Sequence, residues 1–171
     1  MTAEKSFWTF VAMMKRTGPY RLRSLFLPGQ PRVIVKLYCL DRLTEMFLPE
    51  LFSHFKTLQV TPILFAHAWF TTLFGYTFPI EFTLQIWTVF FASGKTFLFR
   101  VGMAILKLLE PSLLKLGFDD ALAALKGCTN LNVSRVIEEA DRFSAIDNRL
   151  LKALKKEAIK SVKTSPLQDI L

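Results

Sequence analysis

Apolar side chains recur at intervals of three and four residues along most of this chain. That spacing gathers them on one face of a helix, whereas the alternation with period two that is typical of half-buried strands occurs in few segments. The pattern predicts an all-α protein, built as a multi-helix array. We expect its helices at residues 4–16, 32–47, 50–56, 62–75, 79–94, 97–109, 121–126, 133–140 and 150–162.

The stretch 57–94 is nearly uncharged, with Glu81 as its only charged residue. A helix that crosses a bilayer needs ~20 consecutive apolar residues, so the charge spacing alone would allow one. Proline suits the first turn of a helix and glycine suits its end, and the two alternate here as Pro62, Gly75, Pro79 and Gly94. They leave two runs of about a dozen residues, the length of core helices rather than of membrane spans. We therefore predict two packed helices and keep an integral membrane protein as the less favoured alternative.

Residues that favour turns and helix caps set further boundaries. The Thr-Gly-Pro sequence at 17–19 should stop the first helix, and Pro49 should interrupt the chain between the second helix and the third. Asn132 is expected to start a helix, and regular structure should end at Pro166. No low-complexity linker separates these elements, so the pattern predicts one domain.

The charge of the chain is +8 and unevenly placed, in a composition that is 51% hydrophobic and includes 17 Phe. A composition this apolar predicts a folded core rather than disorder. The basic residues form two clusters, Lys15, Arg16, Arg21, Arg23, Arg32 and Lys36 near the amino end and Arg149, Lys152, Lys155, Lys156, Lys160 and Lys163 near the carboxyl end. A basic face can meet nucleic acid, acidic lipid or an acidic protein. We expect no nucleic acid, because interleaved aromatic residues are missing. We also expect the last helix to pack on the domain, because its apolar face has no aromatic anchor for a membrane.

Candidate chemical sites are few. Cys39 and Cys128 lie far apart and outside any CxxC pattern, which suits a reducing compartment and gives no metal or disulfide framework. His54 and His67 are the only histidines, and no acidic residue lies at ligand spacing from both. Gly94-Lys95-Thr96 resembles the end of a phosphate-binding loop, but the required glycine five positions earlier is missing. We therefore predict no catalytic residue, no metal site and no cofactor.

The order of residues in the apolar stretch is more specific than its composition. Pro49-Glu50-Leu51-Phe52 is followed at fitting separations by Trp69-Phe70, Phe78-Pro79, Ile86-Trp87 and Gly94. This order resembles the carboxyl-terminal half of the TBC domain, whose family activates Rab-type GTPases, and the likeness extends over residues 5–158. Residues 159–171 would be the end of the basic helix and a short tail. The resemblance implies a structural role for the family-motif residues Trp69, Phe70, Phe74, Pro79, Trp87 and Gly94.

The resemblance implies a regulator of membrane trafficking rather than an enzyme with its own substrate. Its partner would be a GTP-bound Rab-type GTPase, and through that GTPase the protein would associate peripherally with endomembranes from the cytoplasm. One local departure is Thr88, since the family usually has an acid after the Ile-Trp pair. The departure affects a local helix contact and leaves the fold assignment unchanged.

A larger departure concerns the two catalytic side chains that this family inserts into the GTPase. One is an arginine from an Ile-x-x-Asp-x-x-Arg motif, which neutralises charge on the transferred phosphoryl group, and the other is a glutamine from a Tyr-x-Gln motif, which orients water. Neither motif occurs in this chain: Ile137 is followed three positions later by Ala140, and no tyrosine is followed two positions later by glutamine. Both motifs belong to the amino-terminal half of the domain. We therefore expect a truncated or non-catalytic member of the family, with no catalytic role for the basic residues near the amino end (Arg21, Arg23 and Arg32).

Half a domain also raises a packing problem. A helix that is apolar on all sides, such as 97–109, would lose partners that the other half supplies, and a large exposed apolar patch marks an interface. Self-association through such a face is therefore expected. The alternative function is a helical scaffold or interaction module that does not bind GTPases.

Overall fold

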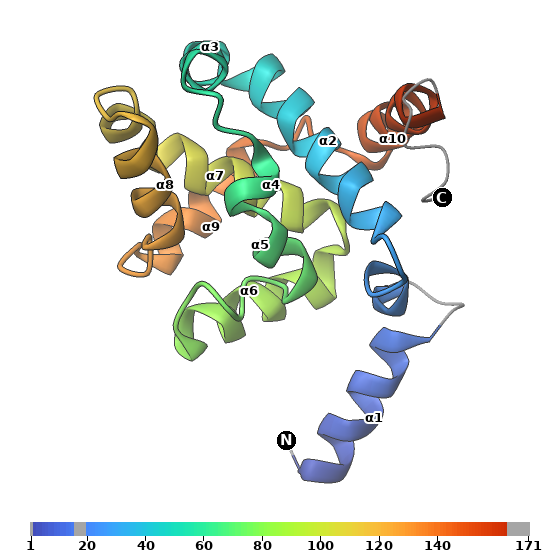
Figure 1. Cartoon of the computed structure of the whole chain (residues 1–171). Coiled ribbons are helices and arrows are strands. Elements are labelled where there is room, and N and C mark those ends of the chain that lie inside the picture. The colour runs from blue at the N-terminus through green and yellow to red at the C-terminus, as the bar shows by residue number, and fades with distance from the viewer. Residues whose placement is uncertain (1, 16–19, 164–171) are drawn as a thin grey trace.

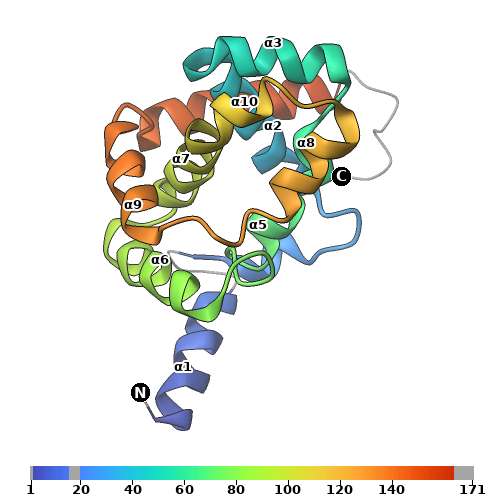
Figure 2. The same ribbon diagram turned by 90° about the vertical axis from the view of Figure 1, so that its left-hand side faces the viewer.

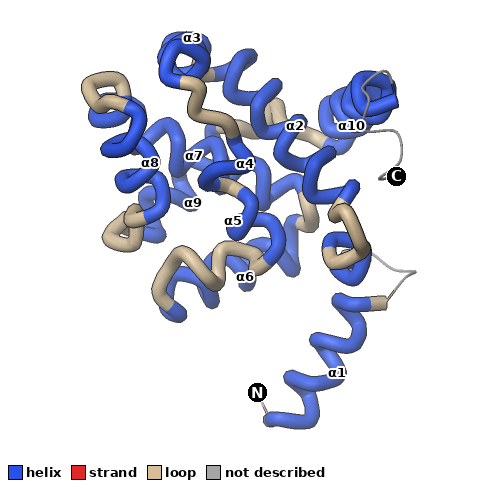
Figure 3. The backbone as a smooth tube through the Cα atoms, viewed as in Figure 1, coloured by secondary structure: helices blue, strands red, loops and turns tan. Residues whose placement is uncertain are grey.

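The computed structural model describes residues 2–15 and 20–163, and within them it contains helices, turns and loops but no strand (Figure 3). The all-α prediction is therefore confirmed. The elements are α1 (Ala3–Met14), the 3₁₀ helix η1 (Leu22–Leu25), α2 (Pro31–Phe47), α3 (Pro49–Leu58), α4 (Pro62–Phe65), α5 (His67–Thr71), α6 (Ile80–Ser93), α7 (Thr96–Leu113), α8 (Phe118–Lys126), α9 (Val133–Arg142) and α10 (Asn148–Lys163). The stop predicted at residues 17–19 and the end predicted at Pro166 lie outside the described residues.

Proline and asparagine begin several helices where the sequence predicts. Proline occupies the first position of α2, α3 and α4, where its missing N–H breaks no helical hydrogen bond. Leu48 alone separates α2 from α3, as Pro49 predicts. The Asn132 side chain accepts a hydrogen bond of 3.1 Å from the Arg135 amide and so caps α9.

Helix α7 forms the centre of the core. From Thr96 to Leu106 every residue except Arg100 is buried, and α2, α6 and α9 pack around this helix (Figure 1). The predicted central helix is confirmed. It continues beyond residue 109 to Leu113, because Pro111 lies in the last turn and breaks only the bond to the carbonyl of the exposed residue Lys107. The expectation that this helix would lose its packing partners is wrong, since the described elements enclose it.

The single helix predicted over residues 62–75 is also wrong. The chain forms two short helices there, α4 and α5, followed by turns. Leu73 and Phe74 take left-handed backbone angles, with φ of 50° and 68°, and both side chains are buried. The Thr72 hydroxyl accepts a 3.1 Å hydrogen bond from the Tyr76 amide and so favours a turn over a continuing helix. Burial of the Leu73 and Phe74 side chains thus outweighs the local preference for a helix that would continue to Gly75.

Helix α6 matches the second predicted run. Pro79 precedes it, and Gly94 ends it with a left-handed φ of 81°, a conformation that glycine adopts without steric cost. In the part of the chain that the structure describes, no helix combines the length and the apolar character needed to cross a bilayer.

The two ends of the described chain differ in how they pack. Helix α1 extends away from the other helices (Figures 1 and 2). Helix α10 instead lies along α2 and buries Leu151, Leu154 and Ala158. The Tyr38 hydroxyl of α2 donates a 2.7 Å hydrogen bond to the Glu157 carboxylate of α10. The predicted packing of the basic last helix on the domain is therefore confirmed.

Both cysteines are buried and free. Cys39 lies within α2 and Cys128 follows α8. Burial raises the pKa of each thiol to about 11. The neutral thiol therefore predominates at neutral pH.

Candidate functional site

The family-motif aromatic residues lie mainly in the core. Trp69, Phe70 and Phe74 are fully buried. Trp87 is half-buried, and its indole N–H donates a 2.9 Å hydrogen bond to the Leu73 carbonyl, which fastens α6 to the turn after α5. These positions favour a packing role. The structural role of the family-motif residues therefore stays a prediction, and the geometry supports it.

Trp69 is the largest fully buried side chain. Its ring centroid lies 5.2 Å from that of Phe65 and 5.8 Å from that of Phe74. The face of α7 approaches the same ring at Gly102, where a side chain would lie 3.9 Å from the indole. The indole N–H finds no hydrogen-bond acceptor among the described residues. The residue therefore contributes through packing alone.

Three exposed aromatic side chains lie on α1. Phe7, Trp8 and Phe10 are each more than half exposed. Beside them runs a groove of about 500 Å³, lined largely by apolar side chains that include Phe10, Met13, Phe26, Leu84, Trp87 and Phe91. We call the three exposed residues the α1 aromatic face. Exposed apolar surface of this kind is typical of an interaction surface or a ligand groove.

Positive charge is concentrated around a second hollow, the basic cavity, of about 390 Å³. It lies between the segment before η1, the amino end of α2, the turn from α6 to α7, and α10. Its cationic side chains are Arg21, Arg32, Lys36, Lys95 and Lys155. No carboxylate from the described residues lines it. The cavity is therefore a site of concentrated positive charge.

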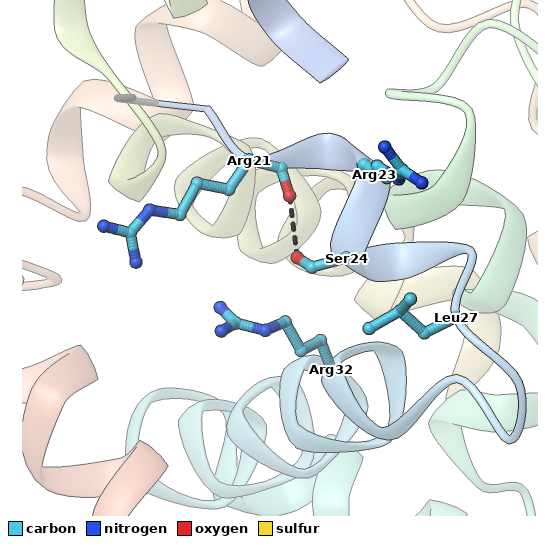
Figure 4. A pocket seen from close by; sticks show the side chains of 5 residues that line it. All are labelled: Arg21, Arg23, Ser24, Leu27 and Arg32. Atoms are coloured by element: carbon cyan, nitrogen blue, oxygen red, sulfur yellow. Dashed lines mark hydrogen bonds between the residues drawn. The ribbon is translucent and has the colours of Figure 1, made fainter. Parts of the chain in front are cut away.

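Figure 4 shows a smaller hollow of about 170 Å³, which shares Arg21, Ser24 and Arg32 with the basic cavity. The Arg21 and Arg32 side chains extend toward the same side, whereas Arg23 points away from both. The Ser24 hydroxyl donates a 2.7 Å hydrogen bond to the Arg21 carbonyl, and Arg21 itself has a left-handed φ of 54°. This turn directs Arg21 toward Arg32, on the opposite wall.

Lys36 has an unusual environment in the basic cavity. Its ammonium lies 5.1 Å from the ring centroids of both Phe70 and Phe99. Burial, with a smaller contribution from the nearby charges of Lys155 and Lys95, lowers the pKa of Lys36 to about 7. Burial, followed by the same kind of repulsion, also lowers the pKa of Lys95. Both pKa shifts come mainly from burial, and the neighbouring cations add to them.

The sequence identifies the members of this cavity but not their convergence. Arg21, Arg32 and Lys36 belong to the first basic cluster and Lys155 to the second, and the structure brings them together. Lys95 belongs to neither basic cluster and occurs only in the incomplete phosphate-loop motif. Lys95 directly follows Gly94, which ends α6, and this position between α6 and α7 places it in the wall of the cavity.

The two histidines and Thr88 have local roles. The His54 ring nitrogen lies 3.1 Å from the Leu116 carbonyl, and the His67 ring nitrogen lies 2.6 Å from the Gln30 side-chain oxygen. The Thr88 hydroxyl donates to the Leu84 carbonyl within α6. None of these contacts points to catalysis.

Comparisons with known proteins agree on one family. A model of the Rab-GTPase-TBC domain matches residues 1–114. The GTPase-activating protein GYP5 of Saccharomyces cerevisiae is 38% identical over 122 residues, which are 71% of this chain and 13% of that protein. The ecotropic viral integration site 5 protein of Mus musculus is 34% identical over 71% of this chain and 15% of its own length. GYP5 of Eremothecium gossypii is 36% identical over 84% of this chain and 18% of its own length. The chain thus spans less than a fifth of each of these relatives.

Proposed function

This chain belongs to the Rab-GTPase-TBC domain family, and from that premise we propose that it engages a GTP-bound Rab-type GTPase as part of a trafficking regulator. The observation that carries the proposal is the family match over residues 1–114. Relatives described as GTPase-activating proteins support it. We place the interaction on the cytoplasmic side of endomembranes, where the GTPase would recruit the protein.

We further propose that the TBC-like unit extends beyond the matched region to residue 158. The packing of α9 against α7 and of α10 against α2 supports this extent, because both late helices bury apolar residues on elements inside the match. Residues 159–171 would then add the end of α10 and a tail.

We propose that this chain alone does not catalyse GTP hydrolysis. The arginine and glutamine motifs of the family are missing from its sequence. The family-motif residues Trp69, Phe70 and Phe74 are buried in the core and offer no replacement. We propose a member that binds the GTPase without completing its active site.

A single-turnover hydrolysis assay tests this function. With GTP-loaded Rab-type GTPases, the purified chain should leave the hydrolysis rate within about twofold of the intrinsic rate, whereas an inserted arginine accelerates it by ~10³–10⁵. Phosphate release measures the rate. Stimulation beyond that range would contradict the non-catalytic proposal.

Calorimetric titration of the same GTPases tests engagement separately. Binding to the GTP-loaded form over the GDP-loaded form is expected. Failure to bind any member of a broad panel in either state would contradict engagement and favour the scaffold function.

A second candidate function rests on the α1 aromatic face. We propose that it mediates self-association, because three large aromatic side chains lie exposed beside an apolar groove. The replacements Phe7→Gln, Trp8→Gln and Phe10→Gln together should convert an associating protein into a monomer, since glutamine is polar and favours helix. Light scattering after size-exclusion chromatography measures the mass.

A matched control removes exposed apolar side chains elsewhere. Met46→Gln with Ile63→Gln, on α2 and α4, should leave the association unchanged. A wild-type protein that remains monomeric at the highest soluble concentration would refute self-association.

A further inference from the structure

The basic cavity has the features of a ligand site that the GTPase-related function does not use. We propose that it binds a small anion carrying at least two phosphate groups, such as a phosphorylated inositol ring, either free or as a lipid headgroup. This inference is independent of GTPase engagement. It rests on the charge, shape and apolar lining of the cavity.

The charge of the cavity is unbalanced. The described ion pairs of the chain involve Arg42, Lys56, Lys107 and Arg142. None of the five cavity cations takes part in an ion pair with a described residue. Four separate segments converge on the cavity although their cations repel one another. A bound anion would remove this repulsion and form charge-assisted hydrogen bonds.

Two helices add to the positive potential. Pro31 and Arg32 begin α2 and line the cavity, and Lys95 and Leu98 place the amino end of α7 at its edge. These helices have 17 and 18 residues, and their amino ends carry partial positive charge. The backbone therefore favours an anion where the side chains do.

The size of the cavity and its walls indicate the kind of anion. A phosphate group carries about 1.5–2 negative charges at neutral pH, so five cations match two or more such groups. Val35, Phe90 and Leu98 add apolar walls to the volume of about 390 Å³. A compact ring bearing several phosphates satisfies both the charge and the apolar contact. A single inorganic phosphate would leave most of the cations unneutralised.

Lys36 gives the site a pH dependence. The groups that surround it are Arg21 and Tyr20 before η1, Arg32 and Cys39 on α2, Lys95 at the start of α7 and Lys155 on α10. The pKa of Lys36 is about 7 in the unliganded protein, and a bound polyanion favours its protonated form. Binding should therefore favour proton uptake at Lys36.

Calorimetry with inositol hexakisphosphate tests the site in the full chain. We expect one binding site per chain. Arg32→Gln with Lys155→Gln should weaken binding at least about tenfold, since each removes a charge-assisted contact. Neither side chain is buried, so the double variant should fold, which circular dichroism checks. Absence of binding by the wild-type chain would overturn the proposal.

A matched control removes the same number of positive charges, both from α10. Lys152→Gln with Lys156→Gln removes two exposed cations that do not line the cavity. This variant should bind more tightly than the Arg32→Gln, Lys155→Gln variant and within about twofold of wild type, because its two exposed cations do not line the cavity and salt screens them. Equal weakening in both double variants would show attraction by net charge alone and would overturn the site.

Vesicles separate the two sources of the ligand. Phosphatidylcholine vesicles containing phosphatidylinositol bisphosphate are compared with vesicles of equal charge made with phosphatidylserine. Sedimentation with the first alone supports a lipid headgroup, and binding of the soluble probe without vesicle binding supports a free anion. Equal sedimentation with both vesicles, insensitive to the Arg32 and Lys155 substitutions, would overturn the inference.

Discussion

Replacing Trp69 by alanine is expected to lower the free energy of unfolding by about 3–5 kcal/mol, because the change removes a large buried ring and leaves a cavity. Trp69 has no exposed surface and packs against Phe65, Phe74 and the backbone of α7 at Gly102. Single domains are stable by only about 5–15 kcal/mol, so the variant should lose much of its stability. Urea denaturation followed by circular dichroism measures the change.

Two further substitutions test whether the loss of stability in Trp69→Ala comes from the removal of a buried ring. Trp8→Ala removes the same kind of side chain from α1, where it is 59% exposed, and should change stability by less than about 1 kcal/mol. Trp69→Phe should be milder than Trp69→Ala, because it keeps an aromatic ring and removes an N–H that lacks a described acceptor. Similar losses for Trp8→Ala and Trp69→Ala would contradict a core role specific to Trp69.

Replacing Lys36 by methionine is expected to raise the free energy of unfolding by about 2–4 kcal/mol at pH 6, because it removes a half-buried charge whose pKa burial has lowered. Each unit of pKa shift corresponds to about 1.4 kcal/mol. The contacts with Phe70 and Phe99 favour the charged amine and offset part of that penalty. Methionine fills similar space without charge.

The benefit of Lys36→Met should depend on pH in a defined direction. Below pH 7 the amine binds a proton in both folded and unfolded chains, so the full penalty opposes folding of the wild type. Between pH 7 and 10.5, the folded amine is neutral while the unfolded amine retains its proton, so wild-type stability rises with pH. The advantage of the variant should therefore shrink over that interval in urea denaturation.

Lys152→Met provides the control for charge removal at an exposed position. It should shift stability little at any pH, because solvent already stabilises that ammonium. A gain for Lys36→Met that did not vary with pH would contradict the titration of Lys36 as its cause. If the basic cavity binds a polyanion, the Lys36→Met variant should also bind that polyanion less tightly. Lys36 would then lower the stability of the fold and contribute to anion binding.

The helical class and several boundaries could be predicted because their causes are local. Pro49, Gly94 and Asn132 act on the backbone within one turn, and their effects appear as predicted. The break after α5 could not be predicted in this way. Leu73 and Phe74 adopt left-handed angles that bulky residues avoid, and only their burial among distant side chains offsets that preference. Helix periodicity therefore does not predict a backbone conformation that depends on tertiary packing.

The basic cavity shows the same limit for function. Every cation in it is visible in the sequence, but Arg21 and Lys155 come from opposite ends of the chain. Their proximity depends on how α10 packs along α2, which helix periodicity does not determine. The aromatic neighbours of Lys36 come from α5 and α7. Charge clustering along the sequence thus identifies cationic residues of the cavity, and the packing of the helices brings them together.

The burial of both cysteines also has a practical consequence. Alkylating reagents attack the thiolate, and the raised pKa values of Cys39 and Cys128 keep that form scarce at neutral pH. The chain contains no other cysteine. A single cysteine introduced on the surface would therefore be the preferred position for a fluorophore or spin label, with the native thiols left in place.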